Sequence, residues 1–296
     1  MPAPLHEHTI PDLDRPLRLD VYAAELPCFA SRSAARKACK RGEVHLDGEP
    51  AESSRFVQPG QRLSVHPSEA TPPRAWAHPL HIPWQDDHLA IVCKPPGVPV
   101  SGNHWRTVEQ ALLQLLPTPA LPDALPWAQP AHRLDLRTGG LLLVSRSRRA
   151  QVGLGEAFAS RQIRKRYVAV LHGRLDGEGE VDAPIEGRTA HSRWEAVAHR
   201  PALHTDWLTT VHLWPTTGRT HQLRLHMAGL GHPILGDDRY GPEGKVLRGA
   251  GLFLWANRLQ LSHPVTGAPI DVEQPPPPRF HTRLDREEAR WHKFRA

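Results

Sequence analysis

A proline-rich stretch in the first third of the chain constrains its architecture more than any other feature. Residues 67–82 read PSEATPPRAWAHPLHI and show no repeating apolar face. Because proline fixes φ and has no backbone N–H, such a stretch neither continues a helix nor pairs as a central strand. We therefore predict an interdomain linker at 67–82, a small domain at 17–66 and a larger domain at 83–280.

The two ends of the chain lie outside these predicted domains. Residues 1–16 are polar, interrupted by proline and without periodicity, so we predict a flexible leader. The proline run 275–278 is predicted to close the larger domain. Residues 281–296 form a basic tail, for which a short helix and disorder are both open.

The larger domain mixes strand and helix signals. Thr107 and Ser147 each precede a helical pattern as an N-cap, and several apolar runs are typical of strands. The predicted strands lie within DDHLAIVCKPPGVPV, RTGGLLLVSRS, RKRYVAVLHG, DWLTTVHLWP and LFLWANRLQLS. This pattern predicts an α+β fold with a largely antiparallel sheet.

A basic helix followed by a hairpin is predicted for the small domain. The segment SRSAARKACKRG offers Ser31 or Ser33 as the N-cap and Gly42 as the stop. Ala34, Ala35 and Ala38 supply a slim inward face, and Asp47-Gly48 suits the turn of the hairpin. Five cations crowd the outer side of the helix: Arg32, Arg36, Lys37, Lys40 and Arg41.

The charge balance favours a polyanionic partner. The net charge is +6 and the isoelectric point is about 9.6, although many basic proteins bind no nucleic acid. Three scattered cysteines indicate neither a disulfide framework nor a structural zinc site. With no signal peptide and no apolar run long enough to span a bilayer, we expect a soluble, cytoplasmic protein that does not act at a membrane.

The strongest chemical signal is a polar loop directly before an apolar strand. In AHRLDLRTGGLLLVSR, Arg133 and Arg137 flank Asp135, and nearby cations favour the ionised carboxylate that a nucleophile or base requires. An ordinary ion pair at the start of a strand would give the same spacing.

Two further segments carry clustered cations. In WPTTGRTHQLRLHMAGLGHPILGDDRYG, Arg219 and Arg224 could meet a carboxylate or phosphates, or could lie on a solvated surface strand; the histidines there do not match a metal motif. In IRKRYVAVLHG, Tyr167 follows three cations and could stack on an unpaired base, or could be a core residue of the strand. Hydrolase, kinase and dinucleotide-binding motifs are absent from the sequence.

In combination these segments resemble the RluA-type family of RNA pseudouridine synthases. HRLDLRTGGLLL is similar to that family's H-R-L-D-x-x-T-S-G-L-L-L signature, and KPPGVPV, KRYVAVLHG and GRTHQLRLHMAGLGHPILGDDRYG resemble its other motifs in the same order. The segment 17–66 resembles a small RNA-binding domain shared with a ribosomal small-subunit protein. One departure is Gly139, which stands where the family has serine, so a hydroxyl beside the loop of Asp135 is missing. Glycine is expected to loosen this loop and remove a possible hydrogen bond, with little effect on function.

The resemblance implies a fold and a set of roles. The fold would be a twisted antiparallel sheet with flanking helices and a central cleft, preceded by a small α/β RNA-binding domain. Asp135 would initiate cleavage of the glycosidic bond, by covalent attack or through a ribose intermediate, with Arg224 paired to it and keeping it ionised. Tyr167 would stack on the target base. Arg133 would hold the extruded nucleotide, Arg219 would contact phosphate, and the five cations of the basic helix would contact RNA.

The resemblance also implies a substrate class. It favours uridine in large-subunit ribosomal RNA, with transfer RNA as the competitor, and a monomer that needs neither cofactor nor metal. Two other hypotheses stay open: a catalytically silent RNA-binding or ribosome-assembly factor, and a metal-dependent nuclease.

Overall fold

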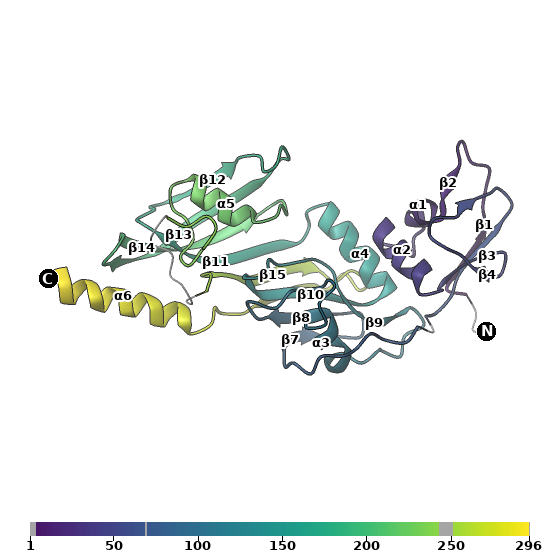
Figure 1. Ribbon diagram of the computed structural model, residues 1–296, viewed down its shortest axis with the longest axis horizontal. Coiled ribbons are helices and arrows are strands. Elements are labelled where there is room, and N and C mark those ends of the chain that lie inside the picture. The colour runs from purple at the N-terminus through teal and green to yellow at the C-terminus, as the bar shows by residue number, and fades with distance from the viewer. Residues whose placement is uncertain (1–3, 69, 243–250, 296) are drawn as a thin grey trace.

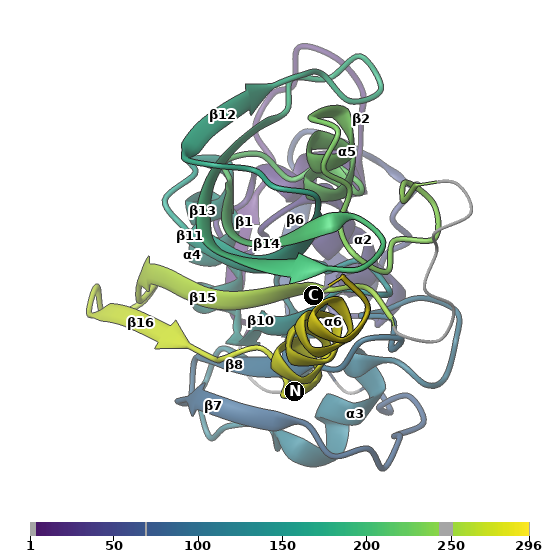
Figure 2. The same ribbon diagram turned by 90° about the vertical axis from the view of Figure 1, so that its left-hand side faces the viewer.

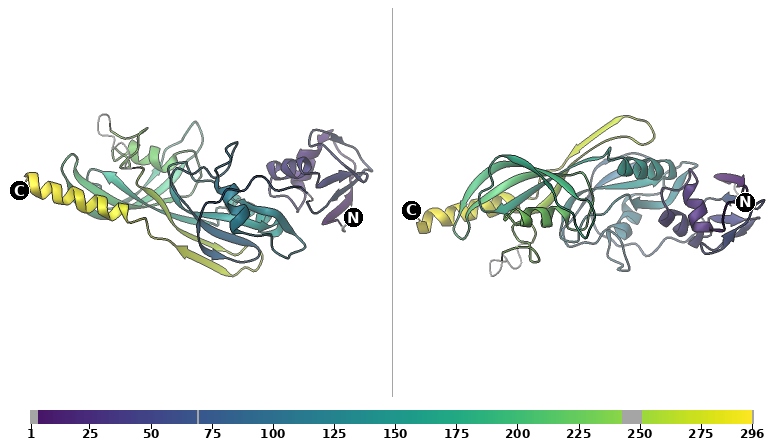
Figure 3. Two further views of the ribbon diagram at one scale, coloured as in Figure 1. Left: turned by 60° about the horizontal axis from the view of Figure 1, so that its bottom comes forward. Right: turned by 90° about the horizontal axis from the view of Figure 1, so that it is seen from above.

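The structure is a computed structural model that describes residues 4–68, 70–242 and 251–295. A small N-terminal domain adjoins a larger domain built on one long sheet, and helix α6 (Arg279–Arg295) extends from the other end of that sheet (Figure 1). Both views of Figure 3 place the small domain and α6 at opposite ends of the long axis. The predicted α+β class with a largely antiparallel sheet is confirmed.

The small domain packs short helices against a four-stranded sheet ordered β1-β6-β3-β4. Ser31 is the N-cap of the basic helix, with its Oγ accepting from the Ala34 N–H at 3.2 Å, and Gly42 ends it at φ +74°. The elements are β1 (His6–Thr9), β2 (Leu17–Arg18), α1 (Leu19–Tyr22), the 3-10 turn η1 (Ala23–Glu25), α2 (Arg32–Lys40), β3 (Val44–Leu46), β4 (Glu49–Pro50), β5 (Phe56–Val57) and β6 (Arg62–Val65).

The expectation of a flexible leader at 1–16 is wrong for its described part. Strand β1 pairs antiparallel with β6, and Ile10 is buried in the core of the small domain. The sequence HEHT lacks an apolar alternation because this edge strand is held mainly by backbone hydrogen bonds, which any side chain permits.

In the described chain, ten strands of the larger domain form one sheet. Their order is β12-β13-β14-β11-β15-β10-β8-β7, with β16 added on β15 and β9 on β10. Figure 2 shows β12 and β13 towards the top and, below them, β15, β10, β8 and β7 in that order. The neighbours are antiparallel except β10 and β15, which run parallel. The strands are β7 (His81–Gln85), β8 (Leu89–Lys94), β9 (Ala124–Pro130), β10 (Gly139–Ser147), β11 (Arg164–His172), β12 (Glu178–Asp182), β13 (His191–Ala202), β14 (Asp206–Pro215), β15 (Leu254–Ser262) and β16 (Pro269–Glu273).

Helices cover both faces of this sheet. One face packs against α3 (Val108–Leu115) and α5 (Gln222–Gly229), and the other against α4 (Arg148–Ala159) and α6. Successive residues of β10 alternate between the two cores, with Leu142 on the α3 side and Leu143 on the α4 side. The sheet is therefore buried on both faces where β10 runs through its centre.

The basic tail left open between helix and disorder belongs to α6. Phe280 at its start packs against Phe253 with ring centroids 5.0 Å apart, and Leu284 is buried in the same cluster. The helix begins directly after the proline run 275–278, so the boundary placed at residue 280 falls inside an element.

A buried ion cluster joins the two domains. Glu43 of the small domain is fully buried, and its carboxylate accepts from Arg148 of α4 at 2.5 Å and from Arg41 at 3.1 Å. The two guanidinium groups outweigh the desolvation of Glu43 and lower its pKa. At Gly155 of α4 an added Cβ would lie 3.2 Å from the Cβ of Ala30. The first turns of α4 are thus packed against the small domain.

We predict that Glu43→Gln loosens the contact between the domains. The change leaves two buried guanidinium groups without their counter-charge, which should lower the free energy of unfolding by about 3 kcal/mol. Urea denaturation and limited proteolysis between residues 70 and 80 would measure it. The exposed Glu49→Gln is the control; equal protease resistance in the two variants would contradict the prediction.

Candidate active site

The five residues singled out for chemistry in the larger domain line one cleft. Its volume is about 550 Å³, a size that accommodates a nucleotide. They come from the loop between β9 and β10, from β11, and from the turn and helix that follow β14. The five are Arg133, Asp135, Tyr167, Arg219 and Arg224.

The loop that carries Asp135 is held by a lysine outside the set of site residues predicted from the sequence. Lys94, the last residue of β8, is fully buried, and its Nζ donates to the carbonyls of Pro95 at 3.0 Å, Leu136 at 3.1 Å and Thr138 at 2.7 Å. Burial lowers the pKa of Lys94 to about 8, opposed by the charge of Asp135. A buried ammonium bound to the carbonyls of Leu136 and Thr138 fixes the part of the loop that directly follows Asp135.

Arg224 does not make the ion pair expected from the resemblance. Its guanidinium is buried on α5 and donates twice to the carboxylate of Asp237, at 2.7 Å each. Burial disfavours its charge, but Asp237 outweighs this and, with a contribution from Asp135, raises its pKa. Arg224 therefore acts on Asp135 through its field across the cleft, while Asp237 fixes its orientation.

The alternative of a solvated surface strand for this segment is wrong. The residues around Arg224 form helix α5, and most of its polar side chains are buried in hydrogen bonds: Gln222 Nε2 lies 2.9 Å, and His226 Nδ1 3.0 Å, from Ser192 Oγ. The segment therefore has no polar face to indicate a helix.

Tyr167 is buried at the floor of the cleft on β11. Its hydroxyl is desolvated and lies near the charge of Asp135, and both effects raise its pKa well above the ordinary range. The phenol therefore stays protonated at neutral pH. Lys165, two residues earlier on the same face of the strand, also lines the cleft, with Nζ 5.8 Å from the ring centre of Phe158.

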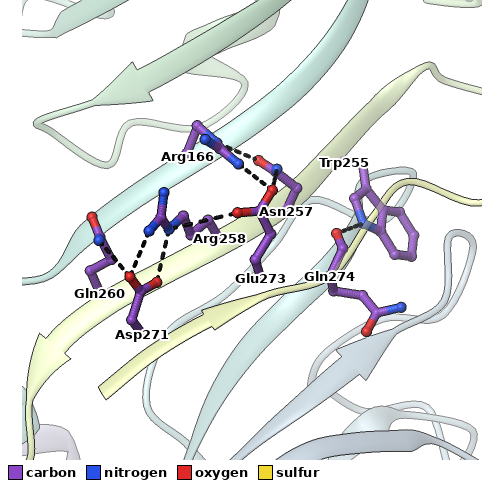
Figure 4. Close-up of polar contacts among 8 residues, drawn as sticks. All are labelled: Arg166, Trp255, Asn257, Arg258, Gln260, Asp271, Glu273 and Gln274. Carbon is purple, nitrogen blue, oxygen red and sulfur yellow. Dashed lines mark hydrogen bonds and ion pairs between the residues drawn. The ribbon is translucent and has the colours of Figure 1, made fainter. Parts of the chain in front are cut away.

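Arg166 points away from the cleft, as the alternation of a strand requires. Its guanidinium lies in an outer network with Asn257 and Glu273, at 3.3 Å and 2.5 Å (Figure 4). On the same surface, Arg258 donates to Asp271 at 2.6 Å and 2.8 Å. Of these neighbouring cations, Lys165 lines the cleft, whereas Arg166 binds side chains of the β15–β16 hairpin.

The cations beside Asp135 have separate environments. Arg133 is exposed at the mouth of the cleft, whereas Arg137 forms an ion pair with Asp238. Arg219 donates from Nε to the Thr189 carbonyl at 2.9 Å.

His132 lies in the loop that carries Asp135, and burial lowers its pKa to about 3, so it is neutral. Its Nε2 accepts from the Leu143 N–H at 3.0 Å.

Gly139, the departure from the family signature, is packed rather than loose. A Cβ there would lie 2.4 Å from Cζ3 of Trp255 and 2.9 Å from Cδ of Pro96. The expectation that glycine loosens the loop is therefore wrong: the indole of Trp255 fills the space where a serine side chain would lie. Figure 4 shows this indole, whose Nε1 donates to the Gln274 carbonyl at 3.2 Å.

The basic face of α2 is only partly free. Arg32 donates to Asp20 at 3.0 Å, and Arg41 is bound to Glu43 in the domain contact. Arg36, Lys37 and Lys40 are exposed and have no ion-pair partner among the described residues. These three remain the candidates for contact with RNA phosphates.

Neither a metal cluster nor a membrane span is found in the described chain. Within residues 4–68, 70–242 and 251–295, no three His, Cys, Asp or Glu side chains converge as ligands would. No helix in those ranges is long and apolar enough to cross a bilayer.

We predict that Gly139→Ser lowers the free energy of unfolding by about 1–3 kcal/mol, because the new side chain meets the Trp255 ring. Trp255→Leu should lower it through a cavity. The double variant should lose less free energy of unfolding than the two single variants lose together, as expected for residues in contact. Urea denaturation measures all three. Gly229→Ser, where a Cβ meets nothing within 4 Å, is the control; strict additivity would contradict the coupling.

A second prediction concerns Lys94 and pH. Its pKa is about 8 in the folded protein and about 10.5 when unfolded, so between these values the unfolded chain binds more protons and stability rises with pH. The difference in unfolding free energy between the native protein and Lys94→Met should be flat below pH 8 and grow by about 3 kcal/mol towards pH 10.5. Chemical denaturation across this range measures it, and a flat difference would argue against a charged, desolvated Lys94.

Known proteins share this arrangement. A family model described as RNA pseudouridylate synthase matches residues 88–229, and an S4 domain model matches residues 17–63. Ribosomal large subunit pseudouridine synthase D of Xanthomonas campestris pv. campestris is 34% identical over 304 aligned positions, covering 92% of this chain and 89% of that protein. Dual-specificity RNA pseudouridine synthase RluA of Haemophilus influenzae is 36% identical over 206 positions, covering 64% of this chain and 89% of that protein.

The solved structures agree with this match. Human RNA Pseudouridylate Synthase Domain Containing 1 superposes with a TM-score of 0.58 at 25% identity, covering 69% of this chain and 86% of that one. Human RNA Pseudouridylate Synthase Domain Containing 4 gives 0.55 at 25% identity, covering 69% and 92%. The chain therefore belongs to the RNA pseudouridylate synthase family, with an S4 domain at its N-terminal end.

Proposed function

We propose that this protein isomerises a uridine of large-subunit ribosomal RNA to pseudouridine, with Asp135 as the group that starts the reaction. One observation supports this proposal above all. Asp135, Tyr167 and Arg224 come from three separate segments and line one cleft, and Lys94 holds the loop that carries Asp135. The relatives that match most of the chain are named for large-subunit ribosomal RNA, which supports this substrate over transfer RNA.

The chemistry conserves every atom of the nucleotide. The bond from N1 of uracil to C1′ of the ribose breaks, the base turns within the cleft, and a bond from C5 to C1′ forms. The proton on C5 is lost and N1 gains one. Asp135 either attacks C1′ or takes a proton from the ribose, and both routes begin with its carboxylate ionised. No step requires a cofactor.

Each of the other cleft residues has a role that its environment supports. Tyr167, buried and protonated, offers an aromatic face for the uracil and a hydroxyl beside Asp135. Arg224, fixed by Asp237, supplies a permanent positive charge. Exposed Arg133 holds the nucleotide once it has left its stack, and Arg219 contacts a phosphate at the rim. We propose that the protein acts as a cytoplasmic monomer.

A catalytically silent RNA-binding or assembly factor is the second candidate. It would use the exposed cations of α2 in the same way and would need no particular group at position 135. The buried arrangement of Lys94, Tyr167 and the Arg224–Asp237 pair around the cleft favours the enzyme, because RNA binding alone gives no reason for these buried charges.

Asp135→Asn should abolish pseudouridine formation, with a rate at least about a thousandfold lower and RNA affinity within about threefold of the native value. The measurement is a pseudouridine map of ribosomal and transfer RNA from cells lacking the gene, complemented with the native protein or the variant. Asp238→Asn, which removes the exposed carboxylate paired with Arg137, is the matched control and should restore modification. If no uridine depends on the native protein, the binding-factor candidate replaces the enzyme.

A further inference from the structure

An exposed tryptophan lies between two arginines in the loop that leads into α3. The side chain of Trp105 is 42% exposed. The guanidinium carbons of Arg74 and Arg106 lie 4.5 Å and 4.7 Å from its ring centroid. We call these three residues the Trp105 cluster. An exposed indole flanked by two guanidinium groups presents a flat aromatic face and positive charge side by side.

The two cations of this cluster are free to bind an anion, as are several other exposed arginines of the chain. Among the described residues, neither Arg74 nor Arg106 has a carboxylate within ion-pair distance. Many exposed arginines of the chain do have one, as in the pairs Arg149–Asp123, Arg174–Asp176, Arg193–Glu178, Arg200–Glu288 and Arg258–Asp271. Two neighbouring positive charges without a counter-charge form a place where an anion is stabilised.

The cluster is held in place although its side chains are exposed. The backbone N–H of Trp76 donates to the Gln110 carbonyl of α3 at 3.1 Å, which fixes the chain two residues after Arg74. Thr107, directly after Arg106, is fully buried and caps α3 with its Oγ1, 3.3 Å from the Gln110 nitrogen. The ring and the guanidinium groups therefore emerge from a fixed base, which reduces the entropy lost on binding.

The same loop is joined to the loop of Asp135. The N–H of Gly97 donates to the Leu136 carbonyl at 2.8 Å, and the Val108 N–H donates to the Pro99 carbonyl at 2.9 Å. The base of the Trp105 loop thus lies against the residue next to Asp135. The side chain of Leu136 itself is 53% exposed. A polynucleotide whose target base enters the cleft would have its neighbouring nucleotides close to this loop.

We propose that the Trp105 cluster binds an unpaired nucleotide of the substrate RNA that flanks the target uridine. The base stacks on the indole, and Arg74 and Arg106 contact the adjoining phosphates. Stacking accepts any base, whereas two guanidinium groups select the phosphate backbone. The proposal rests on the RNA-modifying function stated above and adds a second contact outside the cleft, which would favour targets in single-stranded loops over targets within a duplex.

Trp105→Ala should raise KM about 5- to 100-fold on an unmodified transcript of large-subunit ribosomal RNA, the range measured for loss of one stacked base. The value of kcat should stay within twofold, since the ring touches no reacting atom. Trp105→Phe should recover most of the affinity. The matched control is Phe294→Ala with Lys293→Gln, an exposed aromatic and cation pair near the end of α6, 5.3 Å apart, which should leave KM unchanged.

The contribution of the two arginines is measured from the salt dependence of RNA binding. With Arg74→Gln and Arg106→Gln combined, the slope of log affinity against log salt for the same transcript should fall by about 1.4, because each phosphate contact to a single strand contributes about 0.7. Binding is measured in the Asp135→Asn background, so that it does not depend on turnover.

Four outcomes separate the possibilities. Raised KM, rescue by phenylalanine and a smaller salt slope support the proposal. Native KM and slope in all variants overturn it while leaving the enzyme intact. A loss of modification in cells without any change on naked RNA also overturns it, and indicates a protein partner at this surface. Failure of the native protein to modify any transcript counts against the proposed function instead.

Discussion

A single buried ammonium group holds the geometry of the cleft. Lys94 ends β8, the strand next to the edge strand β7, and its three donors meet the carbonyl of Pro95 and two carbonyls of the loop that carries Asp135. A charge in this position is costly unless every donor is satisfied, so the loop cannot move without leaving a donor or a carbonyl without a partner. The backbone directly after Asp135 is held in place by this one constraint.

Local signals in the sequence were sufficient for much of the fold. Ser31, Thr107 and Ser147 cap the helices that they were predicted to cap, because an N-cap depends only on residues within one turn. The strands in the centre of the sheet were visible as apolar runs. Strands β1, β7, β9, β12, β13 and β16 were not singled out, and the predicted linker 67–82 runs into β7. Polar side chains and prolines hide these strands, and they depend on neighbours to provide hydrogen bonds.

The sequence motifs predicted which residues line the cleft but not which residues these contact. The motifs identified five residues that line the cleft, yet the partner of Arg224 is Asp237, and the space beside Gly139 is taken by Trp255, 116 positions along the chain. Such pairings are decided by how strands and helices pack, which no local pattern encodes. Lys94 did leave a signal: a lysine at the end of the apolar run LAIVC is unusual unless its charge is satisfied inside.

Helix α4 connects two places where RNA is expected. Arg148 at its first position is bound to the small domain, and Phe158 and Ala159 at its other end line the cleft. Twelve residues of helix span about 18 Å. The length of α4 therefore sets the separation between its contact with the small domain and the end of the cleft that it lines. An RNA bound to both parts at once would have to span that distance.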